Sequence, residues 1–284
     1  MENKTSPVEL GTKNVGSLLV GYAVPAIIAM TAASLYNITD RIFIGHGVGA
    51  LAISGLAITF PLMNLAAAFG ALVGAGGSTL LSIRMGQKDY KSANLILGNV
   101  LILNIIIGII FSIVTLLLLN PILYFFGASE NTLPYARDFM LVILCGNVFT
   151  HLYMGMNTLL RSAGNPRKSM FATIVTVLIN LILNPLFIFV FNWGIRGSAL
   201  ATIISQVIVL LWQFHFFSNN DYFIHIQKGI FRLKRKIVTD ILSIGSPQFF
   251  LNAASCVIVI VINQGLIHYG GDLAVGAYGI VNPV

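Results

Sequence analysis

Long apolar runs separated by short polar turns are the feature that most limits how this chain can fold. About 20 apolar residues are enough for a helix to cross the hydrocarbon core of a bilayer. Seven runs reach that length: Leu18–Ile44, Ala50–Ile83, Leu95–Leu119, Phe139–Leu160, Met170–Phe191, Ser198–Phe217 and Ile237–His268. An eighth begins near Leu273. The sequence therefore predicts an all-α polytopic membrane protein.

The composition excludes a soluble protein and gives no sign of a cofactor. Only 9% of the residues are charged, whereas soluble domains carry about 25%. Cys145 and Cys256 both lie inside apolar runs, so neither a disulfide framework nor a metal-binding pair is expected. A net charge of +7 would suit a nucleic-acid partner in a soluble protein. In a membrane chain the positions of the charges matter more, and we expect membrane lipid and no nucleic acid.

The basic residues predict how the chain is oriented. Three of them, Arg41, Arg137 and Arg196, fall on one side of the spans. The other thirteen fall on the opposite side, together with the N-terminus. Because Lys and Arg prefer cytoplasmic loops, we expect a cytoplasmic N-terminus in the plasma (inner) membrane. Lipid recognition is the alternative reading of such clusters. It needs roughly 4–8 juxtamembrane basic residues, and only Lys228–Lys236 comes close.

An internal repeat predicts the domain organisation. When the chain is shifted by 222 residues against itself, nine positions are identical over an ungapped stretch of 37. The pairs include Pro25 with Pro247, His46 with His268, Gly49 with Gly271, and Pro61 with Pro283. The seventh span thus reads as a copy of the first. Six spans separate the copies, so they share one orientation, as in transporters built from parallel repeats.

We therefore expect two lobes joined by a linker. The expected segments are a cytoplasmic N-terminus (1–17), an N-lobe of six transmembrane helices (18–217), a basic cytoplasmic linker between the lobes (218–236) and the start of a C-lobe with helix seven and part of helix eight (237–284). On this reading the full protein has two six-helix lobes and this chain is truncated. The alternative is a genuine seven-helix protein, against which the end of the chain inside a span argues.

Asp40, near the far end of the first span, is the strongest candidate for a functional residue. A carboxylate inside a span costs about 2.5–3.5 kcal/mol on insertion scales and usually faces a polar cavity or a partner. The alternative is that Asp40 lies just outside the hydrocarbon and pairs with Arg41. Tyr36 and Asn37 precede Asp40 by four and three residues, so both can share its helix face. This clustering favours a polar pocket.

Further polar side chains are expected at a similar depth. Asn180 and Asn184 share a face of the fifth span, and Thr202 and Gln206 share a face of the sixth. Structural hydrogen bonds between helices are the alternative, at about 0.6 kcal/mol each. The asparagine pair favours function because Pro185 follows at once, and a proline can open a helix beside a cavity. For Thr202 and Gln206 both readings stay open.

Five motifs in order resemble the multidrug and toxic compound extrusion (MATE) transporters over nearly the whole chain. They are Pro25 to Gly45 with Asp40 inside it, Gly86-Gln-Lys88, Leu160-Arg-Ser-Ala-Gly-Asn-Pro166, Asn180-Leu-Ile-Leu-Asn-Pro-Leu-Phe187 and Gly197-Ser-Ala-Leu-Ala-Thr202. The resemblance implies twelve helices in two lobes, and a role for the Asp40 position in coupling cation and substrate in the N-lobe cavity. The flippases of lipid-linked precursors and polysaccharides share this architecture.

Two positions depart from the family pattern. The fifth-helix motif is usually written N-x-x-x-D-P, but this chain has Asn184 in place of the acid. A sodium-coupled branch carries an acid in the seventh helix where this chain has Ser255. Because neither residue can supply a negative charge, the resemblance favours protons over sodium ions as the coupling partner.

These observations favour a secondary antiporter over an enzyme. The expected substrates are small-molecule drugs or toxic metabolites, exchanged against protons or sodium ions by a protein that is monomeric at full length. The expected ion and substrate site consists of Tyr36, Asn37, Asp40, Asn180, Asn184 and Thr202. A flippase for a lipid-linked precursor would favour basic residues in the cavity, and the expected inward-facing set is acidic or neutral. An intramembrane enzyme would need paired catalytic groups, for which only His151 with a hydroxyl residue is available.

Overall fold

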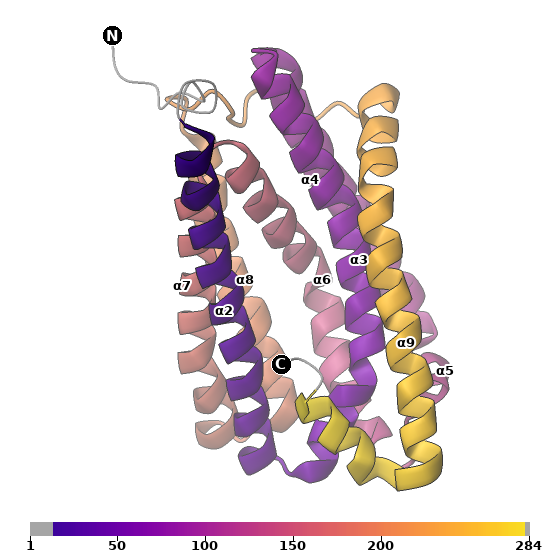
Figure 1. Ribbon diagram of the computed structural model, residues 1–284. Coiled ribbons are helices and arrows are strands. Elements are labelled where there is room, and N and C mark those ends of the chain that lie inside the picture. Colours follow the sequence, from indigo (N-terminus) through magenta and orange to yellow (C-terminus); the bar gives the residue numbers. More distant parts are fainter. Residues whose placement is uncertain (1–13, 282–284) are drawn as a thin grey trace.

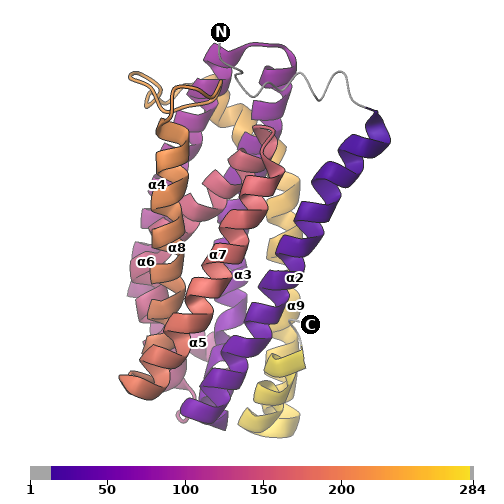
Figure 2. The same ribbon diagram turned by 90° about the vertical axis from the view of Figure 1, so that its left-hand side faces the viewer.

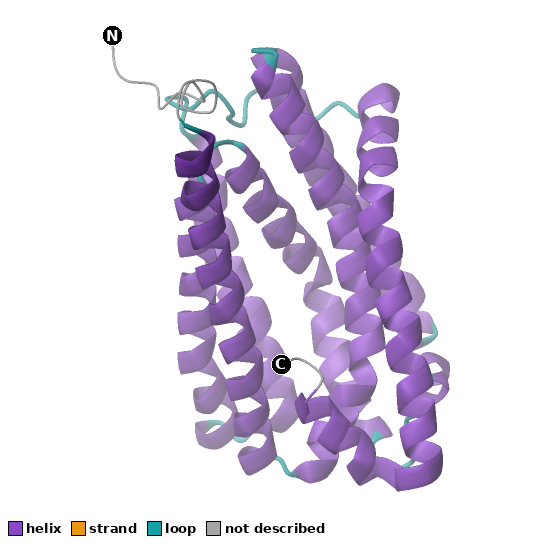
Figure 3. Cartoon of the chain, viewed as in Figure 1, coloured by secondary structure: helices purple, strands orange, loops and turns teal. Residues whose placement is uncertain are grey.

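The structure is a computed structural model that describes residues 14–281. Residues 1–13 of the expected N-terminal segment, and 282–284, lie outside the described part. The helices are α2 (Val15–Gly47), α3 (Ala50–Gly86), α4 (Tyr90–Leu117), α5 (Leu119–Phe125), α6 (Leu133–Ser162), α7 (Pro166–Pro185), η1 (Leu186–Val190), α8 (Gly194–Ser218) and α9 (Arg235–Val281). Seven helical segments in this part are long and apolar enough to cross a membrane, and it contains no strand (Figure 3). The predicted all-α polytopic class is confirmed.

The helices form one elongated bundle whose two ends are easily told apart (Figure 1). The connections α3–α4, α6–α7 and α8–α9 lie at one end, here called the linker end. The connections α2–α3, α5–α6 and η1–α8 lie at the opposite end, here called the far end. Helices α2, α7 and α8 form one side of the bundle, and α3, α4 and α9 form the other, with α6 between them (Figure 1).

One of the connections between the apolar runs is partly helical. The stretch between the third and fourth spans, Asn120–Pro134, contains most of the short helix α5. Leu119 and Leu123 are one turn apart on this helix, and both are buried, with 4% and 0% of their surface exposed. Their burial against the bundle explains why a segment next to polar residues forms a helix that propensity alone would not stabilise.

Helix α9 breaks at the position that the internal repeat identifies. Gly271 has φ 67° and ψ −167°, which separates two helical segments inside α9. Its counterpart in the shifted sequence, Gly49, has φ 118° and ψ 175° and directly precedes α3. Positive φ values of this kind favour glycine. The seventh span therefore ends at a glycine with positive φ, as the first span does. The repeated lobe stays a prediction.

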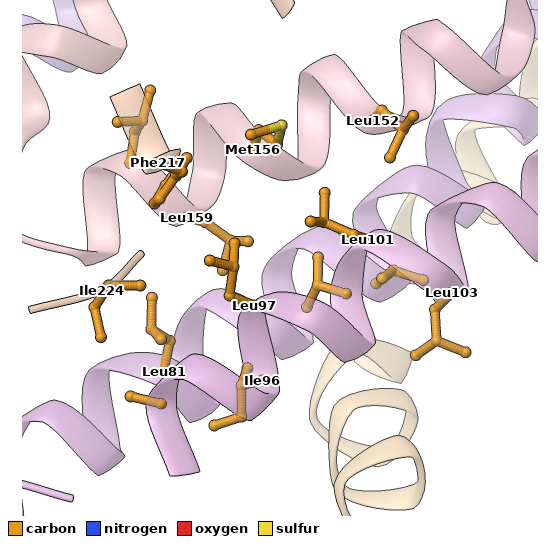
Figure 4. Packing of buried hydrophobic residues seen from close by; sticks show 14 of the residues in the cluster. Leu81, Ile96, Leu97, Leu101, Leu103, Leu152, Met156, Leu159, Phe217 and Ile224 are labelled. Carbon is orange, nitrogen blue, oxygen red and sulfur yellow. The ribbon is translucent and has the colours of Figure 1, made fainter. Parts of the chain in front are cut away.

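Two apolar clusters hold the bundle together. The cluster nearer the linker end joins α3, α4, α6 and α8, where Leu97, Met156, Leu159 and Phe217 interdigitate with almost no exposed surface (Figure 4). The cluster nearer the far end joins α2, α3, α5 and α6 through residues that include Ile44. Dense packing toward both the linker end and the far end fixes the relative positions of the helices that carry polar side chains between them.

Asp89 caps α4, and its protonation is expected to make the stability depend on pH. Hydrogen bonds from the side chain and backbone of Ser92 hold the pKa of Asp89 below the ordinary aspartate value. A lowered folded-state pKa adds stability above the unfolded pKa, and this stability is lost as pH falls through the folded pKa. Asp89→Asn should therefore melt below the parent at neutral pH and match it in acid. A difference in melting temperature between the variant and the parent that stays the same at all pH values would contradict this assignment.

Candidate functional site

Asp40 lies in the far-end half of α2, buried against α7 and α8. The residue is 9% exposed. The Oδ1 atom accepts a hydrogen bond from Nδ2 of Asn184 on α7 and one of 2.7 Å from Oγ of Ser198 on α8. Asn184 and Ser198 are fully buried. Three membrane-spanning helices thus meet at one carboxylate oxygen.

A second polar layer lies one helical turn closer to the linker end. The hydroxyl groups of Tyr36 and Thr202 are 2.9 Å apart, and Nδ2 of Asn180 donates to Thr202 Oγ1 at 3.2 Å. Each helix contributes to both layers through residues four apart: α2 through Tyr36 and Asp40, α7 through Asn180 and Asn184, and α8 through Ser198 and Thr202. This spacing places both side chains of each pair on one helix face. We call these six residues the Asp40 network.

The chain around Pro185 brings α7 and α8 close enough for these contacts. After Pro185 the helix continues as the π-helical turn η1, and a short loop leads into α8. A Cβ atom at Gly197 would lie 3.1 Å from the carbonyl oxygen of Phe187. Glycine therefore permits the start of α8 to pack directly on η1, which positions the next residue, Ser198, against Asp40.

Arg41 is buried but forms no ion pair with its neighbour Asp40, since the ion pairs among residues 14–281 do not include it. Its guanidinium group lies 4.5 Å from the ring centroid of Phe60 on α3, and its Nη1 atom has no hydrogen-bond partner in the described part. The alternative of an Asp40–Arg41 pair is therefore not what the structure shows. The expectation that the inward-facing polar set is only acidic or neutral is also wrong, because a buried cation adjoins the Asp40 network.

The other predicted residues divide into those inside and those outside the network. Tyr36, Asn180, Asn184 and Thr202 belong to it. Asn37 is exposed and contributes none of the network's hydrogen bonds. Successive residues are about 100° apart around a helix, so Asn37 points away from Tyr36, which faces α8. Its role stays a prediction.

Gln206 also lies outside the network, and Ser198 was missed by sequence reasoning. Oε1 of Gln206 accepts a 2.6 Å hydrogen bond from Thr150 on α6. This contact favours the structural reading of Gln206. Ser198 is a common residue type at the start of an apolar run. The signal that could have identified it is its position four residues before Thr202, the same spacing as in the asparagine pair.

The network retains unused hydrogen-bonding capacity. The Oδ1 atoms of Asn180 and Asn184 are buried and have no partner in the part of the chain that is described. Because buried polar atoms are normally paired, these two oxygens are available to accept a hydrogen bond from a ligand or to coordinate a cation. Residues 14–281 contain no group of three or more His, Cys, Asp or Glu side chains that could hold a metal ion.

Two cavities among the described residues lie in different parts of the bundle. Helices α2 and α7 are close at the far end and diverge toward the linker end (Figure 2). A cavity of about 160 Å³ occupies this wedge, lined by residues such as Pro25, Ala29 and Thr173. A larger cavity of about 570 Å³ between α3, α4 and α5 has an apolar lining apart from Thr115, and no residue of the Asp40 network lines it.

A buried acid that accepts hydrogen bonds from two neighbouring helices, in a bundle of membrane-spanning helices, defines a polytopic membrane protein with an ionisable site inside the membrane. A family model described as MatE matches residues 25–186, which is more than half of the chain. The chain belongs to the MatE family.

Individual relatives agree with this assignment. The chain is 28% identical over 262 residues to the multidrug export protein MepA of Staphylococcus aureus, covering 92% of this chain and 58% of that protein. It is 32% identical to the solved structure of the MATE multidrug transporter DinF-BH, with a TM-score of 0.92, covering all of this chain and 63% of that one. A MOP superfamily transporter from Pyrococcus furiosus, whose reversed pocket polarity suggests a different function, is 26% identical with a TM-score of 0.86, over 99% of this chain and 66% of that one. The chain thus spans about three fifths of the length of such relatives.

Proposed function

We propose that the protein is a secondary antiporter that exports cationic or amphiphilic small molecules in exchange for protons. The observation that carries the proposal is the Asp40 network: one buried carboxylate whose hydrogen-bond partners all lack a formal charge. An ionisable group held inside the membrane usually marks an ion or substrate path. The relative described as a multidrug export protein supplies the direction of transport.

The partners of Asp40 can serve both of its protonation states. The hydroxyl group of Ser198 can donate to a carboxylate or accept from a carboxylic acid. The amide of Asn184 donates through Nδ2 in this structure, and a rotation of the amide would present its unpaired Oδ1 to a protonated Asp40. Proton binding therefore needs no side chain to leave the site.

Competition for Asp40 supplies the coupling. The charged carboxylate attracts a cation, whereas the protonated form does not. If proton and substrate bind alternately while the cavity opens to one side and then to the other, the proton gradient drives export. Protons are favoured over sodium because Asn184 and Ser255 replace acids of the family, leaving Asp40 as the acid of the network.

The direct test is ethidium efflux from cells that express the full-length gene, with and without a protonophore. We expect efflux that stops when the protonophore is added and continues when the sodium gradient alone is removed. Efflux that follows the sodium gradient would overturn proton coupling. An absence of efflux for a panel of cationic and amphiphilic compounds would overturn the export function.

Ser198→Ala is expected to reduce efflux about tenfold. The variant removes one of the two hydrogen bonds to Asp40 Oδ1, and bonds to charged groups are worth about 1.5–3 kcal/mol. The matched control is Ser205→Ala on the same helix. Ser205 is equally buried, but its hydroxyl group donates to the carbonyl of Thr202 within α8. Initial efflux rates at equal protein levels measure the effect, and equal rates for the two variants would refute the role of Ser198.

A flippase for an anionic lipid-linked precursor is the second candidate, and Arg41 is the observation that favours it. Its guanidinium group is buried and has a nitrogen without a hydrogen-bond partner among the described residues, as expected of a group that binds an anionic substrate. Arg41→Gln separates the two functions. An antiporter of cations should keep its efflux in this variant, whereas a flippase should lose translocation of its pyrophosphate substrate.

We also propose the membrane setting. The excess of basic residues at the linker end supports a cytoplasmic linker end and a cytoplasmic N-terminus in the plasma (inner) membrane. The family architecture supports a monomer of two six-helix lobes at full length. Labelling a cysteine introduced at exposed Lys88 with a membrane-impermeant thiol reagent tests the orientation in intact cells.

A further inference from the structure

The connection between α8 and α9 is fixed to the bundle by two asparagines of α4. Asn94 donates through Nδ2 to the carbonyl of Phe223 at 3.1 Å and accepts from the backbone N–H of His225 at 2.9 Å. Asn99 repeats this pattern with the carbonyl of Arg232 at 3.1 Å and the N–H of Lys234 at 3.0 Å. Each side chain thus binds the backbone two residues apart, as a neighbouring strand would.

Packing supports the same attachment. Ile224 and Ile230 are 3% and 2% exposed. A Cβ atom at Gly98 would lie 2.2 Å from the carbonyl oxygen of Ile230, so the connection runs directly over the backbone of α4. Figure 1 shows it passing alongside α4 before it enters α9. A connection such as this one, which runs from the end of α8 at Ser218 to the start of α9 at Arg235, is long for a compact domain, and such segments are usually functional loops or linkers.

The last part of the connection presents basic and apolar side chains together on the outside. Lys228, Arg232, Lys234, Arg235 and Lys236 are all exposed, and no ion pair between described residues involves them. Phe231 and Leu233, which alternate with them, are 53% and 49% exposed. The hydrogen bonds to Asn99 use only the backbone of Arg232 and Lys234, so both side chains remain available. We call residues 228–236 the basic strap.

We propose that the basic strap binds anionic phospholipid headgroups of the membrane leaflet at the linker end. Orientation of a membrane protein requires only that the basic residues be present. It does not require their backbone to be clamped, nor two large apolar side chains to stand between them. Basic groups interleaved with exposed apolar ones match a bilayer interface, where the apolar side chains enter the acyl boundary and the cations meet phosphates.

The experiment compares lipid binding by the purified full-length protein. The detergent-solubilised protein is titrated with phosphatidylglycerol or phosphatidylcholine, and bound lipid is counted by native mass spectrometry. The parent should prefer phosphatidylglycerol, and salt should weaken this preference. Replacing Arg232, Lys234, Arg235 and Lys236 by Gln should lower the preference by at least about tenfold.

Matched variants distinguish binding by the basic strap from a general effect of net charge at the linker end. The control replaces four other exposed basic residues of the same end, Lys88, Lys91, Arg161 and Arg167, by Gln and should keep the preference. Phe231→Ser with Leu233→Ser should weaken binding while all charges remain. If the four-residue strap variant does not accumulate, Arg232→Gln and Lys234→Gln alone should each lower the preference about fivefold. Equal losses in strap and control variants, or an undiminished preference in the strap variant, would overturn the proposal.

Discussion

Replacing Asp40 by Asn is expected to abolish proton-driven efflux while the protein remains folded and inserted. Asparagine has nearly the same shape and can keep hydrogen bonds with Asn184 and Ser198, but it neither binds a proton nor carries a charge. A site that cannot change its charge has no differential affinity through which a proton gradient can shift the conformational equilibrium. Ethidium efflux should fall to the level of cells without the transporter.

The measurement must separate lost coupling from lost protein. Membrane levels of the epitope-tagged protein and melting temperatures in detergent should be the same for Asp40→Asn and the parent. Asp138→Asn is a suitable control, because Asp138 pairs with Arg196 in a partly exposed ion pair at the far end, outside the network. Full drug resistance in cells that express Asp40→Asn would refute the proposed role.

Alanine at Gly76 or Gly245 is expected to destabilise the protein by about 1–3 kcal/mol, the usual cost of overpacking. A Cβ atom at Gly76 would lie 1.9 Å from the carbonyl oxygen of Ile241, and one at Gly245 would lie 1.9 Å from that of Leu72. The backbones of α3 and α9 therefore touch at both glycines, and any side chain forces the helices apart. Helix propensity alone would make alanine more stable than glycine by about 1 kcal/mol. A loss of stability in the variants would therefore show that the two backbones are in contact.

A control exists on the same helix. Gly265 of α9 has no atom within 4 Å of its ideal Cβ position, so Gly265→Ala should leave the stability unchanged or raise it slightly. Thermal unfolding in detergent compares the three variants. Because the two contact glycines share one interface, their double variant should cost less than the sum of the single ones. A Gly76→Ala protein as stable as Gly265→Ala would show that the helices do not approach as closely as described.

Local residue pattern was enough to predict the helices. The length and hydrophobicity of each run depend only on neighbouring residues, and a bilayer leaves few alternatives to a helix for such runs. The break at Gly271 lies between the seventh run, which ends at His268, and the eighth, which begins near Leu273. Helix α5 was not predicted because its two buried leucines are stabilised by distant parts of the bundle.

The candidate site was predicted in part. Asp40, Asn180, Asn184 and Thr202 were placed at a common depth because direction and spacing along each span give depth. The sequence did not predict which of these side chains are in contact, because contacts depend on how each helix is rotated about its axis. That rotation brings Ser198 to Asp40, leaves Asn37 exposed and turns Arg41 toward Phe60.

The sequence by itself predicted a bundle of membrane-spanning helices with an acid, Asp40, near the far end of the first span, and a seventh span that reads as a copy of the first. Only the tertiary structure decided that this acid meets an amide and a hydroxyl from two other helices, and that the basic connection is clamped to α4. The physical reason is the range of the interactions. Hydrophobic periodicity acts within one segment, whereas hydrogen bonds between residues more than 100 positions apart form only after the helices have packed.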